Sequence, residues 1–333
     1  MKDVTRKQFL LGGAAAVVSA VSPSFAEEGS AAKSERRTVR FGVVTDSHSA
    51  DTPPRIGRRY RDSVAKMRQA VDTFNKVGVD FMIELGDLKD MGATETKSGG
   101  KNIARPKAKL REEAIGFLDT IEAELARFNG PRYHVLGNHD MDCISKEDYL
   151  AHTENHGAAK GKTFYAFTEG GVKFLVLDGC FNPDRGPYRC GNFDWRKAFL
   201  TDEELAWLDA ELASAAGPSV VFCHQLLDGF SKLGGLHIGN WKRAVEIMEK
   251  RGNVLASIQG HHHPGHYNFR NGIHYWTMKG MICGKYPEHN SYAIVEVAPD
   301  GTITLNGFGD CESRVLKRKG ASANRTKAQK RDS

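Results

Sequence analysis

Residues 133–140 read Tyr-His-Val-Leu-Gly-Asn-His-Asp, an apolar run followed at once by turn-forming and polar residues. The run over 133–136 is typical of a short buried strand, and Gly137-Asn138-His139-Asp140 stands where that strand should end. In open α/β sheets, ligands bind in the loops beyond the carboxyl ends of the strands. Amide, imidazole and carboxylate groups in such a loop favour a divalent metal ion. This stretch therefore predicts a strand that leads into a metal or catalytic site.

The same arrangement recurs at four other expected strands. The polar clusters that follow the apolar runs are Asp46-Ser47-His48, Gly86-Asp87-Leu88-Lys89-Asp90, Gly137-Asn138-His139-Asp140, His224 and Gly260-His261-His262-His263. Taken singly, each has an ordinary explanation, since Gly-Asp is common turn chemistry and a lone histidine after a strand is more often a core residue. Five clusters in this order, each at a strand end, instead indicate one shared site.

Repeated strand–helix units account for most of the chain before residue 265. Strands are expected at the apolar runs 39–45, 81–85, 133–136, 172–177, 220–223 and 254–258. Helices are expected over 58–76, over 110–128, after the capping box Thr201-Asp202-Glu203-Glu204, and over 241–250. Short strands follow at 267–270, 274–278, 292–297 and 302–305. The pattern predicts an α/β body with helices outside the sheets and an all-β end.

The motifs D-x-H, G-D-x-x-D, G-N-H-D, a lone His after a strand, and G-H-x-H together resemble the calcineurin-like metallophosphoesterase superfamily, over about residues 39–263. The resemblance implies an α/β fold of two packed mixed β-sheets flanked by helices, in four layers. It also implies a hydrolase of phosphate esters or diphosphates that uses two divalent metal ions, Mn, Fe or Zn, with Mn favoured. A hydroxide held between the metals would attack phosphorus, without a covalent enzyme intermediate.

Carried over by position, the resemblance implies a role for each motif residue. One metal would be held by Asp46, His48, Asp87 and His263, and the second by Asn138, His224 and His261 around a bridging Asp87. His139 would protonate the leaving group, and Asp140 would orient it. Alternate residues of an extended segment point the same way, so His261 and His263 are expected to face the metals and His262 to face away.

Fewer sequence features bear on the substrate than on the metal ligands. Segments 60–63, 85–90 and 240–242 look similar to the manganese-dependent ADP-ribose/CDP-alcohol diphosphatase branch, which usually has Gln at the position of His48. The expected substrate is a small phosphate compound of nucleotide or diester type. Candidate contacts to it are Arg55, Arg59, Asp90 and Arg189. The arginines near residue 58 fit a solvated helix face equally well. The segment 181–195, rich in Pro, Gly, Arg and aromatic residues, is a candidate lid.

The net charge of +6 comes from the two ends of the chain. Residues 314–333 hold eight basic residues and one acid, whereas 27–313 hold 36 basic and 39 acidic residues. The slightly acidic body argues against specific nucleic-acid binding. Binding of nucleic acid through the basic tail alone is an alternative hypothesis, which predicts salt-sensitive binding. The tail over 314–333 is expected to be disordered. It would either aid solubility or adhere to an anionic envelope or polymer.

The first 26 residues resemble an export signal. A basic start precedes an apolar run diluted by Gly and Ala, and Ser24-Phe25-Ala26 suits a cleavage site. Thr5-Arg6-Lys7-Gln8-Phe9-Leu10 is similar to a twin-arginine signal with Lys7 as the second basic residue, and the general secretory route stays open. We therefore expect a linker over 27–38, the metallophosphoesterase domain over 39–313, export machinery as a partner, and a periplasmic or secreted protein.

Two further expectations concern membranes and cysteines. No apolar run reaches the roughly 18–20 residues needed to cross a bilayer, so the mature chain is expected to lack a transmembrane segment. The six cysteines lack C-x-x-C spacing; Cys180 and Cys190 could form one bridge, and Cys223 is expected to be buried. The competing function is an exported metal- or phosphate-binding protein without turnover.

Overall fold

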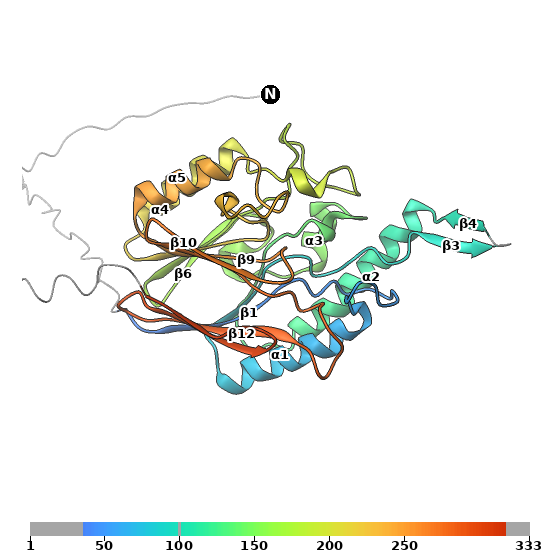
Figure 1. Ribbon diagram of the computed structural model, residues 1–333, viewed down its shortest axis with the longest axis horizontal. Helices are drawn as coiled ribbons and strands as arrows, with labels where there is room; N and C mark the ends of the chain where they lie inside the picture. Colours follow the sequence, from blue (N-terminus) through green and yellow to red (C-terminus); the bar gives the residue numbers. More distant parts are fainter. Residues whose placement is uncertain (1–35, 99–100, 318–333) are drawn as a thin grey trace, which may run out of the picture. The chain divides into compact units, whose positions relative to one another are not determined.

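The structure is a computed structural model that describes residues 36–98 and 101–317. Its centre consists of two packed six-stranded sheets (Figure 1). Helices α1 (Ser63–Val77) and α2 (Lys107–Leu125) cover one outer face, and α4 (Asp202–Ser214) and α5 (Trp241–Arg251) cover the other. The predicted fold class, two mixed sheets flanked by helices in four layers, is confirmed. The predicted signal peptide lies outside the described residues.

The first sheet has the order β14-β13-β12-β1-β2-β5. Its strands are β1 (Val39–Val44), β2 (Phe81–Glu84), β5 (Arg132–His134), β12 (Ser291–Val297), β13 (Ile303–Gly309) and β14 (Arg314–Leu316). Strands β1, β2 and β5 run parallel, so their carboxyl ends meet at one edge of the sheet. The other three strands are added antiparallel, beginning with β12 against β1.

The second sheet has the order β10-β11-β9-β8-β7-β6. Its strands are β6 (Tyr165–Glu169), β7 (Val172–Val176), β8 (Ser219–Cys223), β9 (Val254–Gln259), β10 (His266–Arg270) and β11 (Ile273–Thr277). The four inner strands are parallel, and β6 and β10 close the edges antiparallel. The expected all-β end is therefore divided, because β10 and β11 extend this sheet while β12 to β14 extend the first.

Aromatic rings hold the two sheets together. The ring of Phe41 on β1 is stacked on Phe81 of β2 with centroids 4.7 Å apart. It also meets Phe174 of β7 at 5.4 Å and Phe222 of β8 at 5.9 Å, both edge-to-face. All four rings are buried. Edge-to-face and offset pairs are the favoured aromatic geometries, and large rings dominate core energetics. This packing sets the carboxyl ends of the parallel strands of both sheets beside each other.

Several elements differ from the sequence expectations. Helix α1 begins at Ser63 instead of residue 58, because 55–58 pair as a turn and Tyr60–Asp62 form a 3-10 turn first. The elements that hydrophobic periodicity did not indicate are β6, β14, the short helix α3 (Lys146–His152) and the hairpin of β3 (Glu95–Ser98) and β4 (Lys101–Ala104). Strand β14 pairs with β13, so the folded domain extends beyond the expected boundary at residue 313.

The expected capping box of α4 is only half formed. Thr201 Oγ1 accepts a hydrogen bond from Glu204 N at 3.1 Å, as an N-cap should. The carboxylate of Glu204 turns into the core instead and accepts from Asp178 N at 2.7 Å. Burial and the nearby Asp178 raise the pKa of Glu204 well above its usual value.

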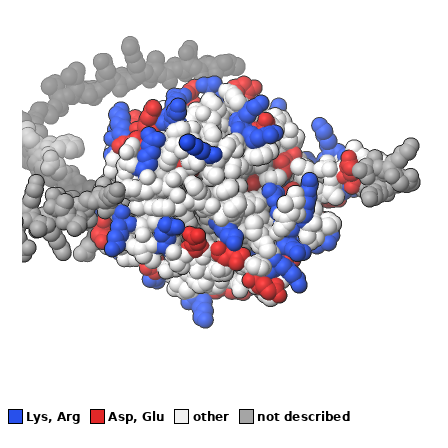
Figure 2. Space-filling view, viewed as in Figure 1, with Lys and Arg blue, Asp and Glu red and all other residues white. Residues whose placement is uncertain are grey.

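Three further observations concern the surface charges, the helices and the cysteines. On the face shown in Figure 2, basic and acidic side chains are interspersed, in keeping with the near-neutral charge of the body. Within the described residues no helix is long and apolar enough to cross a membrane. All six cysteines are free, with Cys180 buried and Cys190 exposed, and Cys223 is buried as expected.

Candidate metal centre

The loops after β1, β2, β5, β8 and β9 approach one another closely enough that two of them need glycine. A Cβ on Gly137 would lie 2.1 Å from Asp87 N, closer than any real contact. Gly86 has a φ of +97°, and a Cβ there would lie 2.6 Å from His224 Nδ1. Glycine is the residue that permits both a positive φ and such close approach of backbones. The two glycines of the G-D and G-N motifs thus allow three polar loops to share one small volume.

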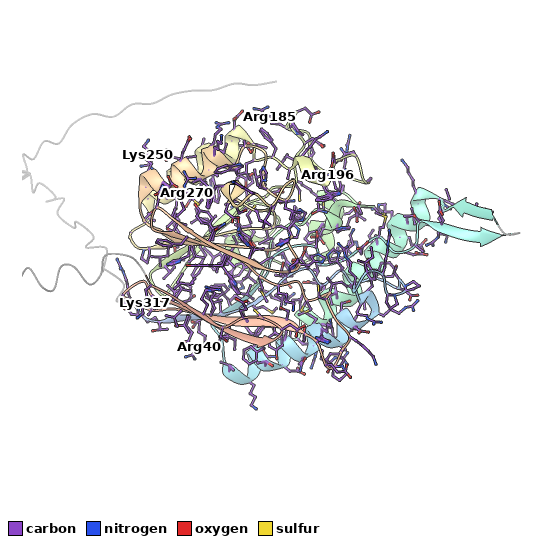
Figure 3. The ribbon with its side chains drawn as sticks, in the orientation of Figure 1. Arg40, Arg185, Arg196, Lys250, Arg270 and Lys317 are labelled. Atoms are coloured by element: carbon purple, nitrogen blue, oxygen red, sulfur yellow. The ribbon has the colours of Figure 1, made fainter. Side chains whose placement is uncertain are left out.

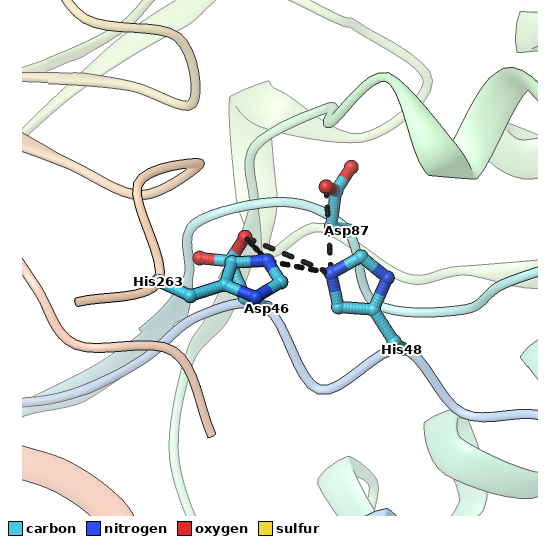
Figure 4. A group of neighbouring side chains, drawn as sticks. All are labelled: Asp46, His48, Asp87 and His263. Atoms are coloured by element: carbon cyan, nitrogen blue, oxygen red, sulfur yellow. Dashed lines mark hydrogen bonds and ion pairs between the residues drawn. The ribbon is translucent and has the colours of Figure 1, made fainter. Parts of the chain in front are cut away.

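The first group of possible metal ligands consists of Asp46, His48, Asp87 and His263 (Figure 4). Their ligand atoms all lie within 4.8 Å of one another. His263 Nε2 is 3.2 Å from Asp46 Oδ1, and His48 Nε2 is 3.6 Å from Asp87 Oδ2. The side chains of Asp46 and His48 are fully buried. Two carboxylates and two imidazoles around one point form a donor set suited to a borderline divalent cation.

A second group shares Asp87 with the first and adds His224 and His261. His224 Nε2 lies 3.2 Å from Asp87 Oδ2 and 3.2 Å from His261 Nδ1. Asn138 belongs to the same region, because its neighbour His139 donates its backbone N–H to Asp87 Oδ1 at 2.7 Å. His262 belongs to none of the possible ligand groups found among the described residues. The structure thus brings all seven predicted ligands to one edge, with Asp87 between the two groups.

The donor atoms fit metal ions better than they fit each other. Asn138 Oδ1 is buried and has no hydrogen-bond partner among the described residues. His48 Nε2 and His263 Nε2 face each other at 3.1 Å, and His224 Nε2 and His261 Nδ1 face each other at 3.2 Å. A buried polar atom without a partner is costly, and two facing imidazole lone pairs repel unless a proton or a cation lies between them. Cations placed in the two groups would satisfy these atoms together.

Hydrogen bonds behind the cluster orient the imidazoles. His48 Nδ1 lies 3.1 Å from Asp90 Oδ2, and His224 Nδ1 lies 2.8 Å from the carbonyl of Leu85. A carbonyl can only accept, so His224 Nδ1 carries the hydrogen and Nε2 is turned to the cluster. A carboxylate or carbonyl on the far ring nitrogen is the usual support of a metal-bound histidine. Burial, then the charge of His224, lowers the pKa of His261 to about 3, so that ring is neutral.

Asp90, which the sequence predicts as a substrate contact, supports the imidazole of His48. Its side chain is nearly buried, Oδ2 faces His48, and Oδ1 accepts from Met91 N at 2.7 Å. Burial alone would raise its pKa, but His48 and His139 outweigh burial and lower the pKa well below the usual range. Asp90 thus contacts His48 and the backbone of Met91, and its contact with the substrate stays a prediction.

The partner of His139 is Asp142 and not Asp140. His139 Nδ1 lies 2.7 Å from Asp142 Oδ2 and 3.6 Å from Asp90 Oδ2. The 3-10 turn His139–Met141 explains the choice, because residues three apart lie on the same side of such a turn. Burial alone would lower the pKa of His139, but Asp142 and Asp87 outweigh it and raise the pKa to about 10. The ring is therefore protonated, and its side chain keeps 27% of its surface exposed.

Asp140 has a different task from the one the sequence suggested. Its Oδ2 accepts from Gly137 N at 2.9 Å and from Asp87 N at 3.0 Å. Its Oδ1 accepts from Leu88 N at 2.9 Å. These bonds join the G-D loop to the G-N loop through backbone donors. Asp140 thus holds the loop geometry and does not contact the ring of His139.

The three predicted arginines lie at different places. The backbone N–H of Arg59 donates to Ile282 O at 3.0 Å, and Ile282 N donates to Asp46 O at 2.9 Å, so Arg59 lies beside the β1 loop. Arg55 and Arg189 are exposed, and neither they nor Arg59 form an ion pair within the described part of the chain. No contact between Arg189 and the ligand groups occurs among the described residues.

The motif geometry now has a counterpart in known proteins, since a model of the family described as calcineurin-like phosphoesterase matches residues 39–265. The chain belongs to this family. It is similar to a manganese-dependent ADP-ribose/CDP-alcohol diphosphatase of Arabidopsis thaliana, 25% identical over 82% of this chain and 95% of the relative. A rice protein (Oryza sativa subsp. japonica) of the same name is 24% identical over 82% of this chain and 92% of its own. These relatives are manganese-dependent, and this phosphoesterase has a cluster able to hold such an ion.

Solved structures share the fold of this phosphoesterase. A dimetal phosphatase of Danio rerio superposes with a TM-score of 0.69 at 20% identity, over 84% of this chain and 99% of the other. A purple acid phosphatase of yellow lupin gives 0.54 at 14% identity, over 83% of this chain and 52% of the other.

Sequence reasoning missed two residues at this phosphoesterase site. Asp142 stands three residues after His139, a spacing that a turn at the strand end would have indicated. Trp195 was noted only as the end of the candidate lid, yet its ring lies 5.7 Å from the ring of His261. No short-range pattern connects residues 195 and 261, so only the folded chain reveals this contact.

Proposed function

We propose that this phosphoesterase is a manganese-dependent hydrolase with a dinuclear centre that cleaves the diphosphate linkage of a small organic compound. The observation that carries the proposal is the pair of ligand groups joined through Asp87. Both groups meet at Asp87 Oδ2, which lies 3.6 Å from His48 Nε2 and 3.2 Å from His224 Nε2. The diphosphatase names of the plant relatives support the choice of a diphosphate over other phosphate esters.

We assign the residues of the cluster to two metal ions. Asp46, His48, Asp87 and His263 would hold one metal, while Asn138, His224, His261 and the shared Asp87 would hold the other. When bound, two such ions activate water and neutralise phosphoryl oxygens. Asn138 contributes an uncharged oxygen, so the loaded site stays attractive to an anion. Asp90 and Leu85 O keep the rings of His48 and His224 turned toward the metals.

His139 is the proposed general acid. Its Nδ1 is engaged by Asp142, so Nε2–H is the group left to donate a proton to the departing oxygen. The neighbouring carboxylates keep the ring charged near neutral pH, which is the state an acid needs before the bond breaks. Partial exposure of the ring gives the leaving group access to it. Asp142 acts through His139 and is a positioning residue.

The arginines supply the proposed contacts to the rest of the substrate. Arg59 lies next to the backbone of Asp46, and Arg55 lies on the adjoining exposed turn. Their guanidinium groups have no carboxylate partner within the described residues, so they can pair with substrate phosphate oxygens without breaking an existing ion pair. Arg189, on the 181–195 segment, is the third proposed contact.

Hydrolysis assays with the metal-free and manganese-loaded protein test the proposal. ADP-ribose, CDP-choline and bis-p-nitrophenyl phosphate are offered to the wild type, to Asp87→Asn and to His139→Ala. We expect activity to require Mn²⁺ and to fall at least 100-fold in Asp87→Asn on every substrate. In His139→Ala the loss should grow with the basicity of the leaving group, up to the roughly 10²–10⁴ that a general acid contributes. Matched controls are Asp119→Asn and His152→Ala, an exposed aspartate–histidine pair on the surface.

Three outcomes would count against the proposal. Full activity in Asp87→Asn and His139→Ala would remove the assigned site. Hydrolysis of the diester without either diphosphate would move the protein to another substrate class. Tight manganese binding without hydrolysis of any of the three compounds would instead favour a metal-binding protein without turnover.

We further propose that the protein acts outside the cytoplasm after export by the twin-arginine route. The support is the basic, apolar and small-residue pattern of residues 1–26. A fusion of these residues to a reporter, with Arg6→Lys and Lys7→Arg variants, checks the route. Loss of export with Arg6→Lys is expected, and export that is indifferent to both changes would point to the general secretory pathway.

A further inference from the structure

Trp195 exposes an aromatic surface beside the proposed metal centre. Two-fifths of the residue, 41%, is accessible to solvent, and it is the one aromatic residue among the exposed large hydrophobic residues of the described chain. Its ring lies 5.7 Å from the ring of the proposed ligand His261, at 68° to it. By contrast, Trp207 on α4 is partly buried and packs on Phe164 at 5.2 Å. Trp195 therefore has a surface that no other described side chain covers.

The backbone around Trp195 is well anchored. Asp194 caps the 3-10 turn Trp195–Lys197 by accepting from Arg196 N. Just before it, the buried ring of Tyr188 is stacked on Phe193 with centroids 4.0 Å apart. On the far side, Phe199 N donates to Gly179 O at 3.3 Å. The indole is thus presented by a fixed turn, which reduces the entropy lost when a flat ligand binds to it.

Arg196 adds charge to the same surface. Its guanidinium carbon lies 5.3 Å from the centroid of the Trp195 ring, over one face, while its Nε pairs with Asp194 at 3.1 Å. Figure 3 marks Arg196 on the segment that leads into α4. The ring of His261 and the guanidinium group of Arg196 are thus both neighbours of the indole, which keeps 41% of the residue exposed. An exposed aromatic ring with a neighbouring arginine is the combination that proteins use to stack nucleobases.

The position relative to the metals suits one substrate class. A metal on His261 would lie about 2 Å from its ring nitrogen, so the indole is one side chain away from the reacting phosphorus. In a nucleotide, the base is separated from its phosphate by a single ribose. We propose that Trp195 is the base-binding residue of the site and that the substrate is a nucleotide-linked diphosphate. This inference rests on the proposed function and specifies which half of the substrate meets which side of the metal centre.

Equilibrium binding tests this assignment without turnover. Cytidine 5′-monophosphate and ribose 5-phosphate, which differ in the base, are titrated into the manganese-loaded protein by calorimetry. We expect Trp195→Ala to weaken cytidine monophosphate binding roughly 5- to 150-fold, the range that stacking of one base provides. Binding of ribose 5-phosphate should stay unchanged. Trp195→Phe should retain most of the affinity and Trp195→Leu should behave like the alanine variant, because only the former keeps a π face.

The results separate base binding from support of His261. Equal weakening of both ligands in Trp195→Ala, with weaker manganese binding, would mean that the indole only shields the metal ligand, and would overturn the proposal. Equal affinity of the wild type for the two ligands, or no binding of either, would overturn it as well. Kinetics with CDP-choline and the base-free compound dimethyl diphosphate keep the two proposals apart. Hydrolysis of both at equal efficiency would leave the diphosphatase function standing while refuting the role of Trp195.

Discussion

Asp140 and Asp142 are both acidic neighbours of His139 in sequence, and the backbone gives them different partners. Asp142 meets Nδ1 of the imidazole, whereas Asp140 accepts backbone N–H groups from Gly137, Asp87 and Leu88. The 3-10 turn His139–Met141 accounts for the difference. Asp142, three residues after His139, lies on the same side of the turn as His139, whereas Asp140, the next residue, points to another side. Loss of either carboxylate should therefore harm the enzyme in a different way.

Asp142→Asn is predicted to impair proton donation by His139. The charged partner that keeps the ring protonated and oriented is lost, so we expect kcat to fall about 10- to 100-fold with diphenyl phosphate, whose basic phenolate leaving group needs a proton. Hydrolysis of bis-p-nitrophenyl phosphate should fall much less, since p-nitrophenolate leaves without one. Steady-state kinetics on both substrates measure the ratio.

Asp140→Asn is the matched control for that experiment. An amide keeps one acceptor oxygen but replaces the other by a donor that would face backbone N–H groups, so we expect lower thermal stability and similar losses on both substrates. A strong leaving-group dependence in Asp140→Asn, with none in Asp142→Asn, would refute the assignment of Asp142.

At the scale of elements, the segment 280–284 connects the two motif loops that supply Asp46 and His263. Met281 N donates to Thr45 O at 3.0 Å, and Gly280 N donates to His263 O at 3.0 Å. The segment is itself held from α1, where the fully buried Lys66 donates to the carbonyls of Met281 and Gly284 at 2.8 Å each. A third bond of the same length goes to Cys283 O. An ammonium group has three hydrogens, one for each carbonyl.

Lys66→Met is predicted to destabilise the fold and weaken metal binding together. The variant keeps the volume of the side chain but leaves buried carbonyls without donors, which should cost about 3 kcal/mol of unfolding free energy. Urea denaturation and manganese titration measure the two effects. Lys76→Met, an exposed position on the same helix, is the control. Unchanged metal affinity in a destabilised Lys66→Met would confine Lys66 to a role in folding.

A second link between elements is the buried group of His134, Glu84 and Glu122. His134 on β5 lies 3.3 Å from Glu122 Oε2 of α2 and 3.9 Å from Glu84 Oε2 of β2. Burial alone would lower the pKa of His134, but Glu122 and Glu84 outweigh it and raise the pKa to about 9. Burial raises the pKa of Glu84 to about 8. Both groups therefore bind protons more tightly in the folded chain than in the unfolded one.

The sign of the resulting pH dependence follows from that difference. Because the folded state holds the extra protons, the free energy of unfolding should decrease as pH rises, from about 6.5 to 9 for His134. The loss from His134 amounts to up to about 3 kcal/mol. Denaturant unfolding between pH 6 and about 9.5 measures it, and the Glu84→Gln/His134→Gln double variant should show a flatter profile. An equally steep profile in the double variant would assign the effect elsewhere.

At the scale of the whole molecule, the proposed metal centre joins the two sheets. Asp46 and Asp87 follow strands of the first sheet, whereas His224, His261 and His263 follow strands of the second. Cations held between these side chains would bridge the layers at the strand ends, beyond the aromatic core. Metal binding should therefore stabilise the entire fold and not only the loops.

Removal of metal is predicted to lower the melting temperature. At a manganese concentration of 100 times Kd, binding to the folded state alone adds about 2.7 kcal/mol, which corresponds to several degrees for a domain of this size. Differential scanning calorimetry with EDTA and with Mn²⁺ measures the shift. Asp87→Asn should lose most of it, and the Asp119→Asn control should retain it. A shift that persists in Asp87→Asn would place the stabilising ion elsewhere.

The strand ends of the site could be predicted from local sequence, whereas several short elements could not. The strand ends carrying Asp46, Asp87, Asn138, His224 and His261 were correctly placed because an apolar run followed by polar residues is a local pattern. Helix α3, β6 and β14 were not found, since each is short and gains its order from neighbours in the fold. The carboxylate of Glu204 does not complete the expected cap, because it accepts a hydrogen bond from the backbone N–H of the buried Asp178 instead.

Local sequence is enough to give the chemical groups of the site, their order along the chain and the strands that present them. Those features are local, and strand periodicity together with donor chemistry is sufficient to infer them. Which of these groups meet depends on the tertiary structure. It paired His139 with Asp142, committed Asp90 to His48, set Trp195 beside His261 and brought Lys66 to the 281–284 segment. Such pairings depend on turn geometry and on the packing of segments far apart in the chain, neither of which a local pattern contains.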